Sequence, residues 1–211
     1  MEIIRSLIFV PGNRANMLDR ARSFNADIIM YDLEDSVPPN EKINARNMAK
    51  EWVPELRNAG RRVMVRCNAL DTGLTHEEIS AVVSPNLYGI SVGKTESEWD
   101  IKEIDEIIAA AERTAGLDIG TIKLIPWIES AKAVRNVDGM STASPRTVAI
   151  AFGGEDYTND MGVQRTDHGE EVYVPRANVA IAARASDIIG LDGPSAAFQN
   201  PDGLRDDAKL A

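Results

Sequence analysis

Short apolar runs alternate with segments of helical periodicity along the whole chain. Seven runs of five to seven residues, rich in Val, Ile, Leu and Ala, have the length of buried strands; they cover 6–10, 27–33, 62–66, 88–92, 122–128, 148–152 and 187–191. Between them, apolar residues recur three and four positions apart, as in the run Ile101, Ile104, Ile107 and Ile108. This spacing predicts helices over 16–25, 40–56, 75–83, 100–116, 130–137 and 175–185.

The alternation of strand and helix predicts an α/β domain built on a parallel sheet. Closure into a (β/α)8 TIM-type barrel is the first candidate, and an open doubly wound sheet is the alternative. No G-x-G-x-x-G pattern follows the first strand, which weakens a dinucleotide-binding interpretation. With 211 residues, the chain is expected to form one domain over 1–211.

The chain is short for a barrel of this type, which needs ~250 residues. Only a polar tail, 200–207, follows the seventh predicted strand. We therefore expect the last strand and helix, and any C-terminal segment, to be missing. The first and seventh strands would then leave an exposed edge, and exposed edges are sites of association. This predicts a homo-oligomer such as a trimer or hexamer.

Composition argues against several classes of function. The net charge of −10 argues against nucleic acid as the main partner. No apolar run approaches the ~20 residues of a membrane span, and the chain opens almost directly with a strand rather than a signal peptide. The single cysteine, Cys67, fits a reducing, cytoplasmic location. With only two histidines, His76 and His168, a histidine-rich metal site or a Ser-His-Asp triad is poorly supported.

Charged or polar side chains follow each of the predicted strands. In a parallel barrel the carboxyl ends of the strands converge on one rim, where active sites lie. Cations and carboxylates gathered on one rim are difficult to explain as core packing, because buried charge is costly unless it is paired or bound to a metal. The strand-end residues are Asn13, Arg14, Glu34, Asp35, Arg66, Lys94, Glu129, Glu155, Asp156 and Asp192.

Two of these strand ends suggest a divalent cation. The run 122–128 ends in Glu129, and the run 148–152 is broken by two glycines and followed by Glu155 and Asp156. Carboxylates with no Cys or His ligand nearby suit a hard cation such as Mg²⁺. Glu129 and Asp156 are therefore the candidate ligands, while Glu155 alternates with Asp156 and is expected to point away.

Each of these residues also has a structural alternative. Glu129 would form an ion pair with Arg66 or Lys94 in a purely structural role, and Asp156 would serve as a helix N-cap. Arg66 at the end of an apolar strand suits bidentate binding of a carboxylate ligand. Its structural alternative is an ion pair with Glu34 or Asp35.

A metal and an arginine on one rim suit a chelating substrate. An α-keto or α-hydroxy acid offers two oxygens to Mg²⁺ and a carboxylate to Arg66. A metal in this position polarises a carbonyl and stabilises an enolate. Formation or cleavage of a carbon–carbon bond follows from that chemistry.

The same stretches resemble a known family. The segments 5–17, 26–46, 65–73, 126–134 and 144–166 are similar, in order, to the citrate lyase β-subunit-like branch of the HpcH/HpaI aldolase/citrate lyase family. The resemblance implies a (β/α)8 barrel that forms or cleaves citryl-, malyl- or citramalyl-CoA with Mg²⁺. Acetyl-CoA and a 2-keto acid would be released through a metal-stabilised enolate.

The resemblance also implies roles for individual residues. Glu129 and Asp156 would hold Mg²⁺, with Glu129 also close to the substrate, and Arg66 would bind the keto-acid carboxylate. The remaining implied residues are Gly154 and Glu155, whose backbone N–H groups would face that carboxylate; Glu34 and Asp35, which would orient Arg66 and metal-bound waters; and Arg14 and Lys42, which would contact CoA phosphates. No catalytic residue is assigned, because relatives supply an acidic one from the C-terminal segment that is expected to be missing.

Three functions follow as hypotheses. The first is a Mg²⁺-dependent carbon–carbon lyase acting on a short 3-hydroxyacyl-CoA. The second is an aldolase acting on free hydroxy-keto acids without CoA. The third is a lyase subunit that works on an acyl carrier protein inside a citrate lyase complex.

Overall fold

A computed structural model describes residues 3–166, 168–195 and 199–211. Each predicted strand is present, shifted by no more than two residues at its ends. The described residues form one parallel sheet of seven strands, which lie side by side in chain order. The strands are β1 (Leu7–Pro11), β2 (Ile28–Asp32), β3 (Val63–Cys67), β4 (Gly89–Val92), β5 (Lys123–Ile128), β6 (Ala149–Phe152) and β7 (Ile189–Leu191).

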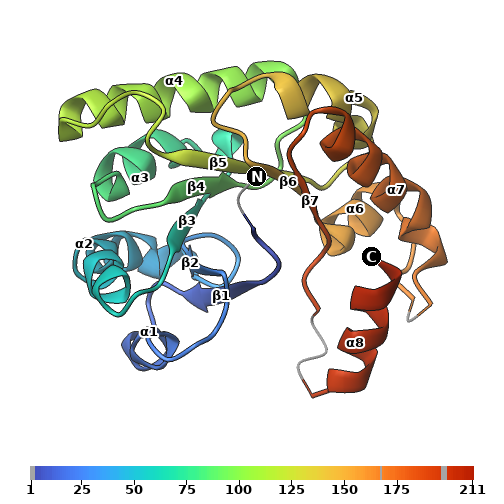
Figure 1. Cartoon of the computed structure of the whole chain (residues 1–211), viewed down its shortest axis with the longest axis horizontal. Helices are drawn as coiled ribbons and strands as arrows, with labels where there is room; N and C mark the ends of the chain where they lie inside the picture. The colour runs from blue at the N-terminus through green and yellow to red at the C-terminus, as the bar shows by residue number, and fades with distance from the viewer. Residues whose placement is uncertain (1–2, 167, 196–198) are drawn as a thin grey trace.

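The sheet curls into most of a barrel, with β1 and β7 as its two edges (Figure 1). A doubly wound sheet reverses its strand order, so the unbroken order β1 to β7 confirms the TIM-type prediction and makes the doubly wound alternative wrong. Within the described residues no eighth strand joins β1 to β7.

Side chains alternate between the inside and the outside of the curled sheet, as the period of a strand requires. On β5, Ile125 and Trp127 join the inner apolar cluster, while Leu124 and Ile128 pack in the outer one beneath the helices. The inner face of β6 carries the small residues Ala149 and Ala151.

Helices cover the outside of the sheet (Figure 1). Their lengths follow local capping: α4 begins at a capping box of Ser97 and Asp100 and ends at Gly116, whose φ of 70° only glycine adopts at low cost. The helices are α1 (Ala15–Ala21), α2 (Lys42–Asn58), α3 (Thr75–Val82), α4 (Glu98–Ala115), α5 (Ala131–Thr142), α6 (Gly154–Met161), α7 (Glu170–Ala185) and α8 (Pro201–Leu210), with short 3-10 turns η1 (Pro39–Glu41) and η2 (Leu70–Thr72).

Several helical boundaries differ from the prediction; α1 ends at Ala21 rather than 25, and α5 ends at Thr142 rather than 137. Helix α6 begins at Gly154, directly after β6, with Gly153 as its N-cap, so Asp156 is not the cap. Helix α7 begins at Glu170 rather than 175 and contains Pro175 in its second turn, where the missing N–H removes one backbone hydrogen bond without ending the helix. The predicted polar tail contains α8, whose N-cap Asn200 accepts a hydrogen bond from Gly203 N–H.

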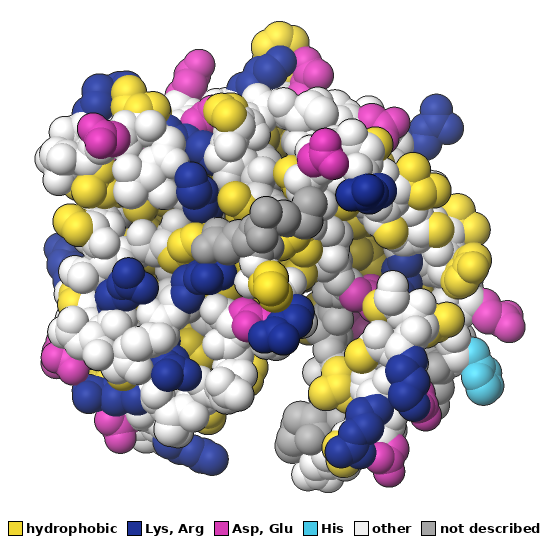
Figure 2. All heavy atoms as spheres, in the orientation of Figure 1, with side chains coloured by type: hydrophobic (Ala, Val, Ile, Leu, Met, Phe, Trp, Pro, Cys, Tyr) yellow, Lys and Arg dark blue, Asp and Glu magenta, His cyan; other side chains and the backbone are white. Residues whose placement is uncertain are grey.

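Most of the apolar surface is buried, but not all of it. Helix α7 exposes Tyr173, Val174 and Ile181, and hydrophobic side chains gather over this helix in the space-filling view (Figure 2). Among the helices of the described residues, none combines the length and apolar character needed to cross a membrane.

Candidate functional site

The carboxyl ends of five neighbouring strands bring the predicted charged residues to one rim. Parallel strands in chain order place their C-terminal ends side by side, so residues far apart in sequence become neighbours. The residues gathered in this way are Asp32, Glu34, Asp35, Arg66, Lys94, Glu129 and Asp156. Arg14, Lys42 and Asp192 lie outside this group.

Arg66 is held by carboxylates of the strand next to its own. Its Nε and Nη2 donate to the two oxygens of Asp32 at 2.7 and 2.8 Å, which is a bidentate pair. Its Nη1 contacts Glu34 at 3.2 Å and Asp35 at 3.1 Å. The guanidinium also lies 4.6 Å from the centre of the Phe9 ring. These contacts fix the direction in which Arg66 faces the rim.

Sequence reasoning missed Asp32, the main partner of Arg66. Asp32 is the last residue of β2 and is completely buried, whereas the pattern read it as an interior position of an apolar run. Burial raises the pKa of Asp32, but the hydrogen bonds and charge of Arg66 outweigh it and hold the pKa below its usual range. A buried aspartate inside an apolar run is itself a sequence signal, because it requires a partner.

Glu34 lies between two cations. Its Oε2 faces Arg66 Nη1 at 3.2 Å, and its Oε1 accepts a hydrogen bond from Lys94 Nζ at 3.2 Å. Burial nevertheless raises the pKa of Glu34. Asp35 is half-exposed and contacts the same two cations, Arg66 at 3.1 Å and Lys94 at 3.9 Å.

Glu129 is a buried carboxylate without a cationic partner. Its exposed fraction is 7%, and within the described residues no Lys or Arg side-chain nitrogen lies within 4.0 Å of its carboxylate. It accepts a hydrogen bond from the backbone N–H of Lys94 at 2.8 Å. Burial raises the pKa of Glu129 to about 7, and the charges of Asp156 and Glu34 act in the same direction. The ion-pair alternative for Glu129 is therefore not what the structure contains.

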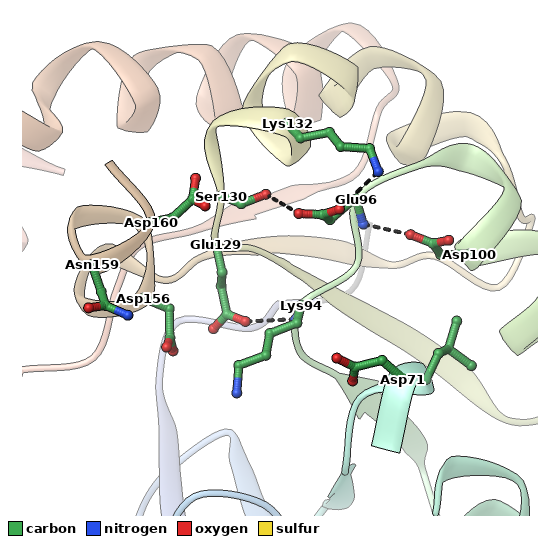
Figure 3. A pocket seen from close by; sticks show the side chains of 11 residues that line it. Asp71, Lys94, Glu96, Asp100, Glu129, Ser130, Lys132, Asp156, Asn159 and Asp160 are labelled. Atoms are coloured by element: carbon green, nitrogen blue, oxygen red, sulfur yellow. Dashed lines mark hydrogen bonds and ion pairs between the residues drawn. The ribbon is translucent and has the colours of Figure 1, made fainter. Parts of the chain in front are cut away.

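Asp156 and Glu155 face different ways. Both lie in the first turn of α6. The Asp156 carboxylate is directed toward the same space as that of Glu129 (Figure 3). The exposed side chain of Glu155 lies toward Arg165, with 3.6 Å between Oε1 and Nε. Gly154 and Glu155 both lie at the N-terminus of α6, where free backbone N–H groups favour an anion, and their contact with a substrate carboxylate stays a prediction.

Two cavities meet at Glu129 and Asp156. One, of about 480 Å³, is polar and is also lined by Lys94, Glu96 and Lys132 (Figure 3). The other, of about 280 Å³, has Arg66 on one side. Its apolar walls are Phe9, Trp127 and Pro194.

Trp127 is a second residue that the sequence pattern did not single out. Its ring packs against Phe9, with 5.6 Å between ring centres, and its indole N–H donates to Ser91 Oγ at 2.7 Å. This hydrogen bond holds in place the ring that lines the smaller cavity together with Arg66 and Glu129. The wall of the smaller cavity is therefore rigid.

The oxygen donors at the rim suit an open Mg²⁺ site rather than a closed cage. Within the described residues no group of three or more His, Cys, Asp or Glu side chains is arranged around a common point. Mg²⁺ does not require such a cage, since it is commonly held by one or two carboxylates and keeps several waters. Carboxylates outnumber cations in this group. The carboxylates are Asp32, Glu34, Asp35, Glu129 and Asp156, and the cations are Arg66 and Lys94. The excess negative charge and the oxygen donors Glu129 and Asp156 fit a divalent cation.

Lys42 and Arg14 are placed differently from the other candidates. Lys42 Nζ donates to the carbonyl oxygens of Leu33 and Glu34 at 2.8 and 2.7 Å, so it braces the loop that follows β2. Arg14 is exposed at the start of α1. Contact of either residue with CoA phosphates stays a prediction.

Two known lyases are similar in sequence to most of this chain. Citrate lyase subunit beta of Leuconostoc mesenteroides subsp. cremoris is 37% identical over 188 residues, which cover 89% of this chain. L-malyl-CoA/beta-methylmalyl-CoA lyase of Cereibacter sphaeroides is 28% identical, over 97% of this chain and 70% of that protein. The chain spans 62% of the length of the Leuconostoc relative.

A solved structure shares the fold. The citrate lyase beta subunit of M. tuberculosis complexed with oxaloacetate and magnesium superposes with a TM-score of 0.76 at 23% identity, over 99% of this chain and 86% of that one. The family model described as HpcH/HpaI aldolase/citrate lyase matches residues 5–211. Because this match covers nearly the whole chain, the chain belongs to the HpcH/HpaI aldolase/citrate lyase family.

Proposed function

We propose that this chain is a Mg²⁺-dependent carbon–carbon lyase acting on a short 3-hydroxyacyl-CoA of the citryl-, malyl- or citramalyl-CoA type. One observation carries the proposal. The unpaired carboxylate of Glu129 and that of Asp156 line both cavities, and the Arg66 guanidinium lies beside one of them. The products would be acetyl-CoA and a 2-keto acid.

The chain's own residues have separate tasks in this reaction. Glu129 and Asp156 would hold Mg²⁺, which when bound supplies the positive charge that polarises the carbonyl and stabilises an enolate. Arg66 would bind the keto-acid carboxylate in the smaller cavity. Asp32 holds Arg66 by two hydrogen bonds, which keeps its guanidinium oriented before the ligand arrives.

The N-terminus of α6 supplies a second contact for the same carboxylate. Its first-turn N–H groups have no intrahelical partners and carry the positive end of the helix dipole. Trp127 and Phe9 exclude water from one side of the cavity. Electrostatic contacts are stronger where water is excluded.

A subunit acting on an acyl carrier protein is the second candidate. The 37% identity to a citrate lyase subunit beta favours it over a free aldolase. The two differ in the carrier of the acyl group, which lies outside the metal and keto-acid contacts described above. Co-purification with a carrier protein supports this candidate, and turnover of pyruvate or oxaloacetate without any thioester supports the free aldolase.

Calorimetry of metal and keto-acid binding tests the proposal first. Wild type is titrated with oxaloacetate or pyruvate, with and without Mg²⁺, beside Asp156→Asn and the control Asp160→Asn on the same helix. We expect binding that requires Mg²⁺, is lost in Asp156→Asn and survives in Asp160→Asn. Mg²⁺-dependent cleavage of the three CoA thioesters is then assayed. Keto-acid binding that depends neither on Mg²⁺ nor on Asp156 would overturn the assignment of the site.

A further inference from the structure

The turn that follows β4, at Gly93, lies between the carboxylates of Glu34 and Glu129. A Cβ atom placed on Gly93 would lie 3.0 Å from Glu129 Oε2 and 3.2 Å from both carboxylate oxygens of Glu34. A side chain at position 93 would make these carboxylates shift by a few tenths of an ångström, so the glycine lets both acids approach the same stretch of backbone closely. Glu34 belongs to the group around Arg66, and Glu129 belongs to the candidate metal site.

The next residue, Lys94, has an unusual backbone. Its φ is 54°, in the left-handed region that residues with a Cβ rarely enter, and among the described residues Asp187 is the other non-glycine there. This conformation directs the Lys94 N–H to Glu129 Oε2 at 2.8 Å. The Thr95 hydroxyl then donates to the Trp127 carbonyl at 3.0 Å and anchors the turn to β5.

The Lys94 side chain turns into the polar cavity, where Glu129 and Asp156 also point (Figure 3). Its Nζ donates to Glu34 at 3.2 Å, and 46% of the side chain is exposed. Arg66, in contrast, is 11% exposed and in contact with three carboxylates. The Lys94 ammonium has three donors, so it keeps hydrogen-bonding capacity toward the cavity.

A second lysine in the same cavity has a different setting. Lys132 Nζ lies 2.9 Å from Glu96 Oε2, and 64% of its side chain is exposed. In Figure 3 it lies across the cavity from Lys94 and points toward Glu96, away from Glu129. Lys132 is thus a matched control for the charge of Lys94.

We propose that Lys94 is a ligand-binding residue whose ammonium receives an anionic oxygen of the 2-keto acid in the polar cavity, beside Glu129 and Asp156. This inference rests on the proposed function and adds a second cation to Arg66. The left-handed backbone conformation of Lys94 fits this role. It lets one residue donate its N–H to Glu129 and present its ammonium to the ligand.

A binding role has a different signature from a structural one. A fixed positive charge near Glu129 and Asp156 opposes a metal cation and attracts a ligand anion. Loss of the ammonium alone should therefore strengthen Mg²⁺ binding, by roughly three- to tenfold. It should weaken 2-keto acid binding at saturating Mg²⁺ by about tenfold or more. Loss of the turn should weaken both.

Three variants separate these effects. Lys94→Asn removes the charge and keeps a residue that tolerates the left-handed region. Lys94→Val removes the charge and disfavours that region, since β-branched residues are outliers there. Lys132→Asn removes the same charge from the other side of the cavity. Calorimetric titrations use Mg²⁺ alone, then oxaloacetate or pyruvate at saturating Mg²⁺, and circular dichroism confirms that each variant is folded.

Lys94→Asn should bind Mg²⁺ more tightly and the keto acid more weakly than wild type. Lys94→Val should bind both ligands more weakly. Lys132→Asn should bind both with near wild-type affinity. If Lys94→Asn binds the keto acid as wild type does, the inference is overturned and the proposed function stands. If Lys94→Asn weakens both ligands, the residue is structural. If wild type itself binds no keto acid with Mg²⁺, the proposed function fails together with the inference.

Discussion

At the scale of single residues, this site depends on how each carboxylate is compensated. Asp32 is buried and paired with Arg66, whereas Glu129 is buried and has no cationic partner. A buried charge without a partner is costly and is retained where a ligand supplies the missing charge. The two residues therefore predict opposite effects of neutral substitution.

Asp32→Asn should destabilise the protein. The substitution leaves the Arg66 guanidinium with a weaker partner in a buried position, and breaking a buried pair costs about 3–5 kcal/mol. Urea unfolding at pH 7 measures the loss in the free energy of unfolding. Asp35→Asn removes a charge from the same guanidinium but at a half-exposed position, and should change stability by less than about 1 kcal/mol. Equal losses in the two variants would contradict the argument.

Glu129→Gln should stabilise the metal-free protein at alkaline pH. The folded-state pKa of Glu129 is about 7, against 4.5 for the ordinary carboxyl, so the native state binds more protons between these values. Stability contributed by this group is therefore lost as the pH rises from about 4.5 to 7. At pH 8 with a chelator, we expect a gain of about 2 kcal/mol in the free energy of unfolding.

The gain should vanish at pH 4.5, because Glu129 is then protonated in the native state. The exposed Glu155→Gln serves as the control and should change stability little at either pH. A Glu129→Gln variant that is less stable than wild type at pH 8 would show that the carboxylate is compensated within the folded chain.

At the scale of elements, the short strand-to-helix connection after β6 positions the two carboxylates of the candidate metal site, Glu129 and Asp156. Gly153 follows β6 directly and caps α6, which starts one residue later. A Cβ on Gly153 would lie 2.5 Å from both Cγ and Oε1 of Glu129. The backbone of one element thus fixes the side chain that ends the neighbouring strand.

Gly153→Ala should therefore reduce Mg²⁺ affinity, by roughly tenfold or more, because Glu129 must move to admit the methyl group. Gly162→Ala is the matched control at the other end of α6. Gly162 has a φ of 65° and no neighbour near its Cβ position, so its substitution should cost stability but leave Mg²⁺ binding intact. Calorimetry and thermal unfolding of both variants distinguish the two effects. Unchanged Mg²⁺ affinity in Gly153→Ala would contradict this view of Glu129.

At the scale of the whole molecule, the described sheet has two edges, β1 and β7. Unpaired strand edges present free backbone donors and acceptors and promote association. The exposed side chains of α7 add apolar surface near one of these edges. Both features agree with the predicted homo-oligomer, which still has to be measured.

Light scattering after gel filtration should detect association of the purified chain. Ile8→Lys places a charge on the β1 edge, where Ile8 is 39% exposed, and should shift the equilibrium toward monomer. Ile43→Lys introduces the same charge at a 65% exposed position on α2 and should have no effect. A wild-type chain that runs as a monomer at all concentrations would contradict the prediction.

The sequence pattern was sufficient for the architecture. All seven strands and six of the eight α-helices in the described residues were predicted, because apolar periodicity records which side of each element is buried. The helix starts at α6 and α7 and the presence of α8 were missed, since caps depend on short-range geometry that glycine, proline and polar residues do not specify uniquely.

The candidate site, too, was predicted only in part from the sequence. The position of Glu34, Arg66, Glu129 and Asp156 on one rim was predicted, because strand ends of a parallel sheet must share a rim. Tertiary structure alone decided that Asp32 orients Arg66, that Glu129 lacks a cationic partner, and that Lys94 reaches two carboxylates through a left-handed turn. Periodicity reports burial along one chain segment, whereas charge compensation depends on distances between segments, and only folding sets those distances.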